Sequence, residues 1–256
     1  MQLSGFAGTI ALVTGAAGGI GASLVDLLLA SGSVVVAADL KAPVLARQDG
    51  AQRFHAMALD VTDSAAVEAL VDRVERDIGP IGMGVNVAGV LQSGTIDTID
   101  DMAWHSAFAV NADGVFYVLR ALARVMTPRR SGAMVTVSSN AAGVPRHGMA
   151  AYAASKAAAT MFTRCLGLEM APYGIRCNIV APGSTLTPMQ TGMWADDSGE
   201  QRVIAGLPEI YKTGIPLGKL ASPRDVANAV MFLLSREAGH IAMSDLYVDG
   251  GATLRA

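Results

Sequence analysis

Tyr152 and Lys156 carry the side chains best suited to acid–base chemistry in this chain. They lie four residues apart in the alanine-rich stretch AYAASKAAA, which predicts a helix with both side chains on one face. A phenol with a pKa of about 10 is a weak base at neutral pH, and a neighbouring ammonium group favours its phenolate. We therefore expect Lys156 to lower the pKa of Tyr152, so that Tyr152 acts as a general base. Such pairs also occur on solvated helix faces without any catalytic role. The rest of the chain must therefore show whether this pair is catalytic.

Ser139 and Asn111 are further polar candidates for the same site. Residues 133–137 (AMVTV) form a predicted strand that delivers Ser139 at its carboxyl end. Asn111 lies near the middle of a long helix predicted over residues 104–125, where an asparagine is usually solvated. It follows the apolar run FAV at residues 108–110, which favours an inward orientation.

A glycine-rich turn near the amino terminus is typical of a nucleotide-binding site. Residues 9–14 (TIALVT) form an apolar run of the kind found in buried parallel strands, and a helix is predicted over residues 23–30. The turn between them, GAAGGIG, contains Gly15, Gly19, Ile20 and Gly21. A strand, a glycine turn and a helix in this order let backbone N–H groups approach a pyrophosphate, although the spacing differs from G-x-G-x-x-G.

Asp39 indicates which dinucleotide this site prefers. The apolar run over residues 33–39 (SVVVAAD) ends on this carboxylate, 18 residues after Gly21. A carboxylate in this position accepts hydrogen bonds from the adenosine ribose and repels a 2′-phosphate. Lys41 is nearby, but no arginine or lysine occupies the glycine turn. The sequence therefore favours NAD over NADP. After Asp39, only a short polar connection, up to residue 53, leads to the next strand.

Strands and helices alternate along the rest of the chain. Strands are predicted over residues 54–59, 83–87, 175–180 and 246–248, and helices over residues 67–78 and 225–234. The alternation predicts an α/β fold in which residues 1–256 form a single domain, a Rossmann-type doubly wound parallel sheet with helices on both faces. A ligand is then expected at the carboxyl ends of the strands. The irregular residues 184–220 are a candidate substrate lid, the alternative being a packed insertion.

Composition argues against several other classes of protein. Acidic residues outnumber basic ones by 22 to 19 without a basic cluster, so we expect no nucleic-acid partner. No apolar run approaches the roughly 18 residues of a membrane span, and the amino terminus lacks a signal-peptide pattern, so a cytoplasmic protein without a membrane partner is expected. Cys165 and Cys177 lie in apolar contexts and are expected to be buried thiols. The four histidines, His55, His105, His147 and His240, are scattered, so no metal site is expected.

The ordered set of motifs resembles the short-chain dehydrogenase/reductase family over nearly the whole chain. The matching residues are Thr14 to Gly21, Asp39, Asp60-Val61, Asn86-Val87-Ala88-Gly89, Asn111, Ser139, Tyr152, Lys156 and Pro182-Gly183. Val87 departs from the polar residue usual at that position, and we expect only a small local change from it. The resemblance implies that the nicotinamide cofactor contacts Asp60, Val61, Asn86, Ala88, Gly89, Tyr152, Lys156, Pro182, Gly183 and Thr187.

The same resemblance implies catalytic roles. Tyr152 would act as base and Ser139 would bind the reacting oxygen. Lys156 would hold the cofactor ribose, with Asn111 in a water relay behind it. Members of this family are commonly homotetramers built through two long central helices.

A narrower resemblance is to the 2,3-dihydro-2,3-dihydroxybenzoate dehydrogenases of catechol siderophore biosynthesis within this family. It rests on stretches largely around the expected substrate mouth: residues 145–149, 176–178, 182–185 with 189–190 and 194, 214–219, and 248–251. It implies NAD-dependent oxidation of a small carboxylated cyclohexadiene diol. The alternatives are a dehydrogenase or reductase for another small cyclic or acyl alcohol, and a catalytically silent NAD-binding scaffold, against which the complete catalytic set argues.

Arg146 is the expected ligand of the substrate carboxylate. It precedes Tyr152 by six residues, in the loop after the strand that delivers Ser139, and a guanidinium suits bidentate binding of a carboxylate. Gln190, in the candidate lid, is expected to add a neutral donor, and Met189 beside it to contact the substrate. Both Arg146 and Gln190 could instead be solvated surface residues.

Overall fold

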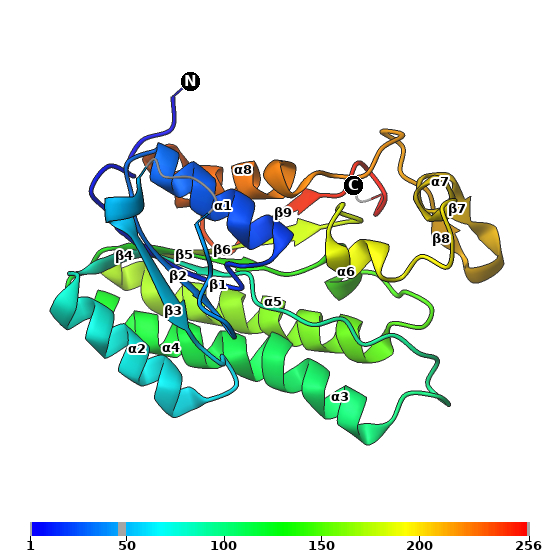
Figure 1. The fold of residues 1–256 in the computed structure, drawn as a ribbon, viewed down its shortest axis with the longest axis horizontal. Coiled ribbons are helices and arrows are strands. Elements are labelled where there is room, and N and C mark those ends of the chain that lie inside the picture. Colours follow the sequence, from blue (N-terminus) through cyan, green and yellow to red (C-terminus); the bar gives the residue numbers. More distant parts are fainter. Residues whose placement is uncertain (1, 46–49, 255–256) are drawn as a thin grey trace.

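A seven-stranded parallel sheet forms the centre of the computed structural model, which describes residues 2–45 and 50–254. Its strand order is β3-β2-β1-β4-β5-β6-β9, and helices cover both of its faces (Figure 1). The strands are β1 (Ile10–Thr14), β2 (Val34–Asp39), β3 (Phe54–Ala58), β4 (Ile81–Asn86), β5 (Gly132–Val137), β6 (Ile175–Pro182) and β9 (Asp245–Val248). The prediction of a doubly wound α/β fold is confirmed.

The helices divide into two layers, one on each face of the sheet (Figure 1). Helices α1 (Gly19–Ala30) and α8 (Pro223–Leu234) pack together on one face. Helices α2 (Ser64–Asp77), α4 (Gly114–Met126) and α5 (Ala150–Met170) cover the other. Short 3-10 turns complete the layers: η1 (Ala51–Arg53), η3 (Asn140–Ala142), η4 (Ala171–Tyr173) and η6 (Arg236–Ala238). Within the described residues, no helix has both the length and the apolar character needed to cross a membrane.

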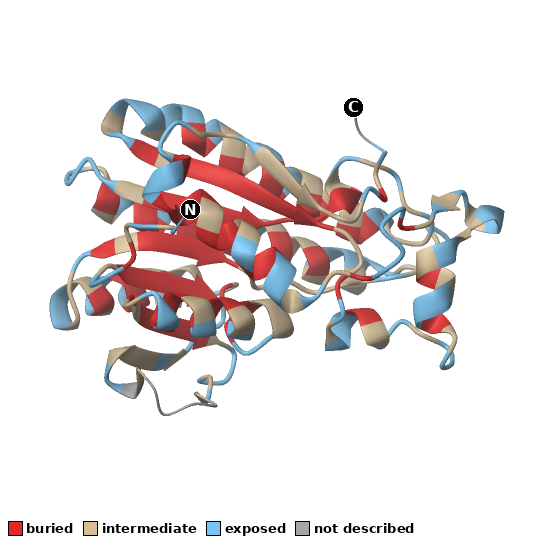
Figure 2. Ribbon diagram, turned by 90° about the horizontal axis from the view of Figure 1, so that it is seen from above, coloured by how far each residue is buried: buried red, intermediate tan, exposed pale blue. Residues whose placement is uncertain are grey.

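Strand β1 shows why the sheet needs cover on both sides. All five of its residues are buried. Ile10 and Leu12 belong to the apolar cluster shared with α2, α4 and α5. Ala11 and Val13 belong to the cluster shared with α1 and α8, because successive side chains of a strand point to opposite faces. Figure 2 shows the buried strands running through the middle, with the exposed residues on the outer sides of the helices.

The strand order reverses direction at β1, which lies between β2 and β4. Thr14, the last residue of β1, is in register with Ala38 of β2 and Asn86 of β4. The loops that leave β1 and β4 diverge at such a point and open a crevice at the carboxyl ends of the strands. The topology therefore places the expected ligand site beside the glycine turn.

The predicted regular helix over residues 104–125 is wrong in its middle. The segment begins as α3 (Asp101–Phe108), widens into the π-helical turn η2 (Ala109–Asp113) and continues as α4. Asn111, within the π turn, is fully buried, as its sequence context predicted. Single π turns inside α-helices are frequent at functional sites, and the side-chain contacts of Asn111 give the reason here.

Residues 184–220 form a small unit beyond the carboxyl ends of β6 and β9 (Figure 1). The unit contains α6 (Pro188–Thr191), α7 (Gly199–Ala205), the turn η5 (Pro208–Ile210) and the two-stranded hairpin of β7 (Gly206–Leu207) and β8 (Lys212–Thr213). Val203, Ile215 and Leu220 pack with Ala252 in a separate apolar cluster. The segment is thus more regular than its sequence suggested, and its movement as a lid remains a prediction.

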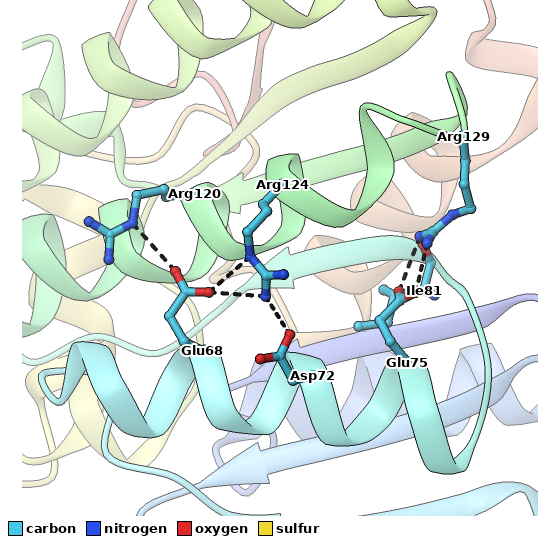
Figure 3. A network of polar contacts seen from close by, with 7 residues as sticks. All are labelled: Glu68, Asp72, Glu75, Ile81, Arg120, Arg124 and Arg129. Atoms are coloured by element: carbon cyan, nitrogen blue, oxygen red, sulfur yellow. Dashed lines mark hydrogen bonds and ion pairs between the residues drawn. The ribbon is translucent and has the colours of Figure 1, made fainter.

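Arginine side chains of α4 join this helix to α2 on the surface (Figure 3). Arg124 lies 2.6 Å from Asp72 and 3.1 Å from Glu68. Beyond the end of α4, Arg129 pairs with Glu75 at 2.6 Å and also donates to the Ile81 carbonyl at 2.9 Å. Exposed ion pairs stabilise a fold by about 0 to 1 kcal/mol each, so this network adds little to the buried core.

Two further predictions differ from the structure or lie partly outside it. Cys177 is buried as expected, but Cys165 is exposed, because it lies on the outer face of α5 between the exposed Met161 and Leu168. The prediction that both thiols are buried is therefore wrong for Cys165. The predicted connection after Asp39 includes residues 46–49, which lie outside the described residues.

Candidate active site

Two adjoining pockets lie at the carboxyl edge of the sheet. The glycine-turn pocket is lined by Gly15, Gly19, Gly21, Asp39, Asp60, Val61, Ala88 and Gly89, among others. The tyrosine pocket is lined by Ser139, Arg146, Tyr152, Lys156, Pro182, Gly183, Gln190 and Lys212, among others. Ile20, Gly89, Thr187 and Met189 line both. The structure therefore brings nearly all predicted site residues to one continuous hollow.

The glycine turn requires glycine for steric reasons. Gly15 has φ +67, and a Cβ there would lie 2.4 Å from the backbone nitrogen of Ala88. A Cβ on Gly21 would lie 2.1 Å from the Gly15 carbonyl oxygen. Helix α1 begins within this turn, at Gly19, and no side chain caps its N-terminus. The first backbone N–H groups of α1 can therefore bind an anion.

Asp39 is fixed against the glycine turn. Its Oδ2 accepts a hydrogen bond from the Ala17 backbone N–H at 2.9 Å, and its Oδ1 accepts one from Leu40 at 2.8 Å. These bonds hold the carboxylate on the wall of the glycine-turn pocket. A fixed carboxylate beside an uncapped helix N-terminus suits a ligand with a pyrophosphate and a ribose.

The ends of β3 and β4 supply the remaining wall of the glycine-turn pocket. Asp60 accepts hydrogen bonds from the Thr62 backbone and hydroxyl at 2.9 and 2.7 Å, and Val61 lines the pocket next to it. Asn86 is buried behind the wall and does not line either pocket, and its Nδ2 has no acceptor within the described chain. Ala88 and Gly89 line the pocket in its place.

Tyr152 and Ser139 meet in the tyrosine pocket. Tyr152 lies in the first turn of α5, and Ser139 follows β5 as the N-cap of η3, where its Oγ accepts a hydrogen bond from the Ala141 N–H at 3.1 Å. Both side chains are largely buried. Burial raises the pKa of Tyr152, and its hydrogen bond with Ser139 opposes that shift. Ser139 is thus the protein group that favours the tyrosinate.

Lys156 lies one turn further along α5 and is almost completely buried. Its Nζ donates to the Val137 carbonyl oxygen at 3.0 Å and lies 5.9 Å from the centroid of the Tyr152 ring. Burial lowers the pKa of Lys156 to about 8. The structure thus differs from the expectation that Lys156 lowers the pKa of Tyr152, because the ammonium is directed toward β5 and its own charged form is disfavoured.

Asn111 supports the site from behind the pocket wall. Its Oδ1 accepts from the Val90 N–H and its Nδ2 donates to the Val90 carbonyl, both at 2.9 Å. Nδ2 also donates to Ser155 Oγ at 3.0 Å. The π turn is what directs this side chain into the gap between the loop after β4 and helix α5. Asn111 therefore fixes that loop relative to the helix that carries Tyr152 and Lys156.

The segment after β6 closes the side of the hollow. Pro182 ends β6, and the Gly183 N–H donates to the Val248 carbonyl at 3.0 Å. Thr187 caps α6, accepting from the Gln190 N–H at 3.4 Å. Gln190 is buried, whereas Met189 is partly exposed at the border of the two pockets.

Two cationic side chains from different segments, Arg146 and Lys212, line the tyrosine pocket. Arg146, in the loop before α5, was predicted there, whereas Lys212 of β8 was not. Burial lowers the pKa of both groups, and the charge of Arg146 lowers the pKa of Lys212 further. No sequence signal indicated Lys212, because it lies 60 residues after Tyr152 in a segment without periodicity.

Comparison with known proteins agrees with this geometry. The family model described as enoyl-(acyl carrier protein) reductase matches residues 15–253. The 2,3-dihydro-2,3-dihydroxybenzoate dehydrogenase of Bacillus subtilis is 52% identical, and the match covers 99% of each chain. The vibriobactin-specific 2,3-dihydro-2,3-dihydroxybenzoate dehydrogenase of Vibrio cholerae is 43% identical over 95% of each. The ligand-free aldohexose dehydrogenase of Thermoplasma acidophilum superposes with a TM-score of 0.86 at 29% identity, covering 100% of this chain and 98% of that one.

The full-length match extends from the glycine turn to the end of β9 and includes every residue of the two pockets. The solved structure shares the whole architecture, and the relatives are dehydrogenases by name. This chain therefore belongs to the short-chain dehydrogenase/reductase family and is an oxidoreductase of that type.

Proposed function

We propose that this oxidoreductase oxidises 2,3-dihydro-2,3-dihydroxybenzoate to 2,3-dihydroxybenzoate with NAD, as a step in catechol siderophore biosynthesis. The observation that carries the proposal is the placing of Ser139, Tyr152 and Lys156 in one pocket that opens into the glycine-turn pocket. The substrate follows from the relatives, since two proteins that are 52% and 43% identical over nearly their full lengths bear this activity in their names.

NAD fits the glycine-turn pocket. The uncapped N-terminus of α1 suits the pyrophosphate, and the fixed carboxylate of Asp39 suits a ribose without a 2′-phosphate. Thr187, at the junction of the pockets, is proposed to meet the nicotinamide carboxamide. The proposed cofactor-binding residues are Gly15, Gly19, Ile20, Gly21, Asp39, Asp60, Val61, Ala88, Gly89, Tyr152, Lys156, Pro182, Gly183 and Thr187, and Asn86 is proposed to support them from behind the pocket wall.

Side chains of the protein accept and transfer the proton of the substrate hydroxyl, and NAD, when bound, would accept the hydride. Tyr152 as the phenolate takes the proton of the substrate hydroxyl, and the carbon that bears this hydroxyl gives up its hydride. Ser139 donates a hydrogen bond to the same oxygen as it becomes a carbonyl. The resulting ketone loses one ring proton, regains one on oxygen and becomes a catechol. Aromatisation makes the oxidation effectively one-way, which agrees with a dehydrogenase that uses NAD.

Lys156 and Asn111 are proposed to support this proton transfer. Lys156 would bind the cofactor ribose through its ammonium, and the positive nicotinamide ring would supply the charge that favours the Tyr152 phenolate. Asn111 lies behind Lys156 and is proposed to hold a water that passes the proton outward.

The substrate is proposed to bind between the loop before α5 and residues 184–220. Arg146 would bind its carboxylate, with Gln190 as a neutral donor and Met189 against the ring. An anion in a pocket needs such partners, because an unpaired buried charge costs several kcal/mol. Residues 184–220 are proposed to close over the bound substrate.

Assembly is proposed to bury the outer faces of α4 and α5. Phe116 packs edge-on against Phe162 with ring centroids 5.4 Å apart, so the two helices form one surface, on which Met161 and Leu168 are 55% and 67% exposed. Two copies of this surface would pair about a two-fold axis into a dimer, and two such dimers would join through a second surface into the proposed homotetramer. We place the enzyme in the cytoplasm, where NAD and the substrate are available to it.

A substrate panel tests the proposed function. The purified protein is incubated with NAD and, separately, the carboxylated dihydrodiol, the dihydrodiol without a carboxylate, and simple cyclic alcohols. We expect kcat/KM to be highest for the carboxylated dihydrodiol. Faster turnover of unrelated cyclic alcohols, or of acyl ketones with a reduced cofactor, would instead assign the protein to another activity within the family.

A further inference from the structure

The tyrosine pocket contains an excess of positive charge. Its described lining residues include Arg146, Lys156 and Lys212 but no aspartate or glutamate. Lys156 donates to a backbone carbonyl deep in the pocket. Arg146 and Lys212 make no hydrogen bond or ion pair with any side chain of the described chain that would neutralise them. Two half-buried cations without partners point to an anionic ligand, because desolvated charges require compensation.

The charge of Asp249 acts on Arg146, but other donors already occupy this carboxylate. Its Oδ1 accepts from the Gly251 N–H at 3.0 Å, and its Oδ2 accepts from the Thr253 hydroxyl and, at 3.5 Å, from Asn140 Nδ2. Asp249 offsets charge on Arg146 and not on Lys212, so about one positive charge of the pair stays uncompensated. That excess matches a ligand with a single carboxylate.

We infer that Lys212 is a second ligand of the substrate carboxylate, in addition to Arg146. The inference rests on the proposed function for the identity of the anion. Arg146 comes from the loop that leads into α5, whereas Lys212 comes from the β7–β8 hairpin beyond the sheet (Figure 1). A carboxylate between them replaces their mutual repulsion with two attractive contacts, so it holds the hairpin against the catalytic part of the site. Lys212 thus makes the enzyme selective for carboxylated diols.

Binding of the reaction product tests Lys212 without relying on turnover. The affinity of the protein for 2,3-dihydroxybenzoate is measured in the presence of NADH, and catechol, which lacks the carboxylate, serves as the matched ligand. Lys212→Met is expected to lower the affinity for 2,3-dihydroxybenzoate by about tenfold or more. The affinity for catechol should change little, because only 2,3-dihydroxybenzoate has a carboxylate that loses its charge partner. Lys212→Arg keeps the charge and should restore most of the affinity.

Arg73→Met is the matched control variant. Arg73 is an exposed cation on α2 that lines neither pocket, so both affinities should equal those of the unmodified protein. Equal weakening of both ligands by Lys212→Met would make Lys212 a structural residue of the hairpin and overturn the inference. An unchanged affinity for 2,3-dihydroxybenzoate, or no binding of it by the unmodified protein, would also overturn it.

The two proposals fail in different ways. A protein that binds 2,3-dihydroxybenzoate through Lys212 but does not oxidise the dihydrodiol refutes the proposed reaction and supports the carboxylate site. A protein that oxidises the dihydrodiol equally well with Lys212→Met refutes only the role of Lys212. Thermal unfolding of each variant shows whether the hairpin remains folded, and Lys212→Arg decides the outcome if the Met variant is unfolded.

Discussion

Tyr152 and Lys156 share one face of α5, and burial moves their pKa values in opposite directions. It raises the pKa of Tyr152 and lowers that of Lys156 to about 8, because in each case the charged form is disfavoured. Only the hydrogen bond from Ser139 favours the tyrosinate. Burial therefore favours the protonated form of Tyr152, and we expect a positively charged cofactor ring, once bound, to favour the tyrosinate.

Replacing Tyr152 with Phe removes the base and keeps the ring packing. We expect turnover to fall by about 10² to 10⁴-fold, the usual contribution of general acid–base catalysis, while NAD affinity stays close to that of the unmodified protein. Steady-state kinetics and an NAD titration check this pair of results. A Phe variant that retains most of its activity would show that another group accepts the proton.

Lys156→Met changes the pH dependence of stability in a calculable direction. The pKa of Lys156 is about 8 in the folded protein against 10.5 ordinarily, so the unfolded chain binds more protons between these values. The free energy of unfolding therefore rises with pH across this window, by about 3 kcal/mol in total. The Met variant should lack this rise in urea unfolding at several pH values, and its turnover and NAD affinity should fall. If the free energy of unfolding of the two proteins depended on pH in the same way, the pKa of Lys156 would not be lowered by burial.

Asp39→Ala tests the cofactor preference. Loss of the carboxylate removes ribose hydrogen bonds and the repulsion of a 2′-phosphate, so NAD should bind more weakly and the preference over NADP should shrink. Dissociation constants for both cofactors, measured on both proteins, give the answer. Equal affinities for NAD and NADP in the unmodified protein would remove the role assigned to Asp39.

Some site residues could be predicted from the sequence and others could not. Gly15, Asp39 and Ser139 lie at or just beyond the carboxyl ends of strands, so their place at the carboxyl edge follows from the alternation of elements. Lys212 lies on a two-residue strand in an irregular segment, and only tertiary packing brings it into the same pocket as Arg146. The orientation of Lys156 toward Val137 was also hidden, because helical spacing fixes which face a side chain occupies but not its hydrogen-bond partner.

At the scale of elements, the π turn in the middle of the 101–126 segment is the feature that departs most from a regular helix. Helical periodicity predicted the helix on either side, but one extra residue per turn leaves no distinct apolar pattern. The turn directs Asn111 to both backbone groups of Val90 and to Ser155. This element thus joins the loop of the glycine-turn pocket to the helix of the tyrosine pocket.

Asn111→Leu should loosen that connection. The N–H and carbonyl of Val90 would lose their partners, so the free energy of unfolding should fall by about 2 kcal/mol, and turnover should fall as well. Ser155→Ala removes the bond from Asn111 and the bond that Ser155 Oγ donates to the Tyr152 carbonyl, but it keeps both contacts with Val90. It serves as the milder control, with an expected loss of about 1 kcal/mol. Urea unfolding checks both values. A Leu variant as stable as the unmodified protein would mean that the loop does not depend on Asn111.

At the scale of the whole molecule, the sheet was predictable because its strands are buried on both faces and read as short apolar runs. The strand order reverses at β1, and this reversal opens the crevice in which the site lies. The outer surface was less predictable: the exposed Cys165 lies in an apolar stretch of α5 that sequence alone assigned to the core. In the sequence, an apolar helix face that packs against another subunit looks the same as one that packs against the core.

Met161→Glu tests the proposed assembly. A charge on the exposed face of α5 cannot be buried against a second copy without a large cost, so sedimentation should show a homotetramer for the unmodified protein and smaller species for the variant. Val44→Glu adds the same charge at a residue that is 91% exposed and away from α5, and should leave the tetramer intact. A Met161→Glu protein that sediments like the unmodified one would exclude this face from the assembly.

The most direct test of the central claim is the stoichiometry of the reaction. The protein is mixed with excess NAD and a limiting amount of 2,3-dihydro-2,3-dihydroxybenzoate, and NADH and the aromatic product are quantified together at completion. We predict one NADH and one 2,3-dihydroxybenzoate for each dihydrodiol consumed, with the reaction running to completion because aromatisation prevents its reversal. Catechol-free reaction mixtures, or a dihydrodiol that survives unchanged beside active protein and NAD, would contradict the account.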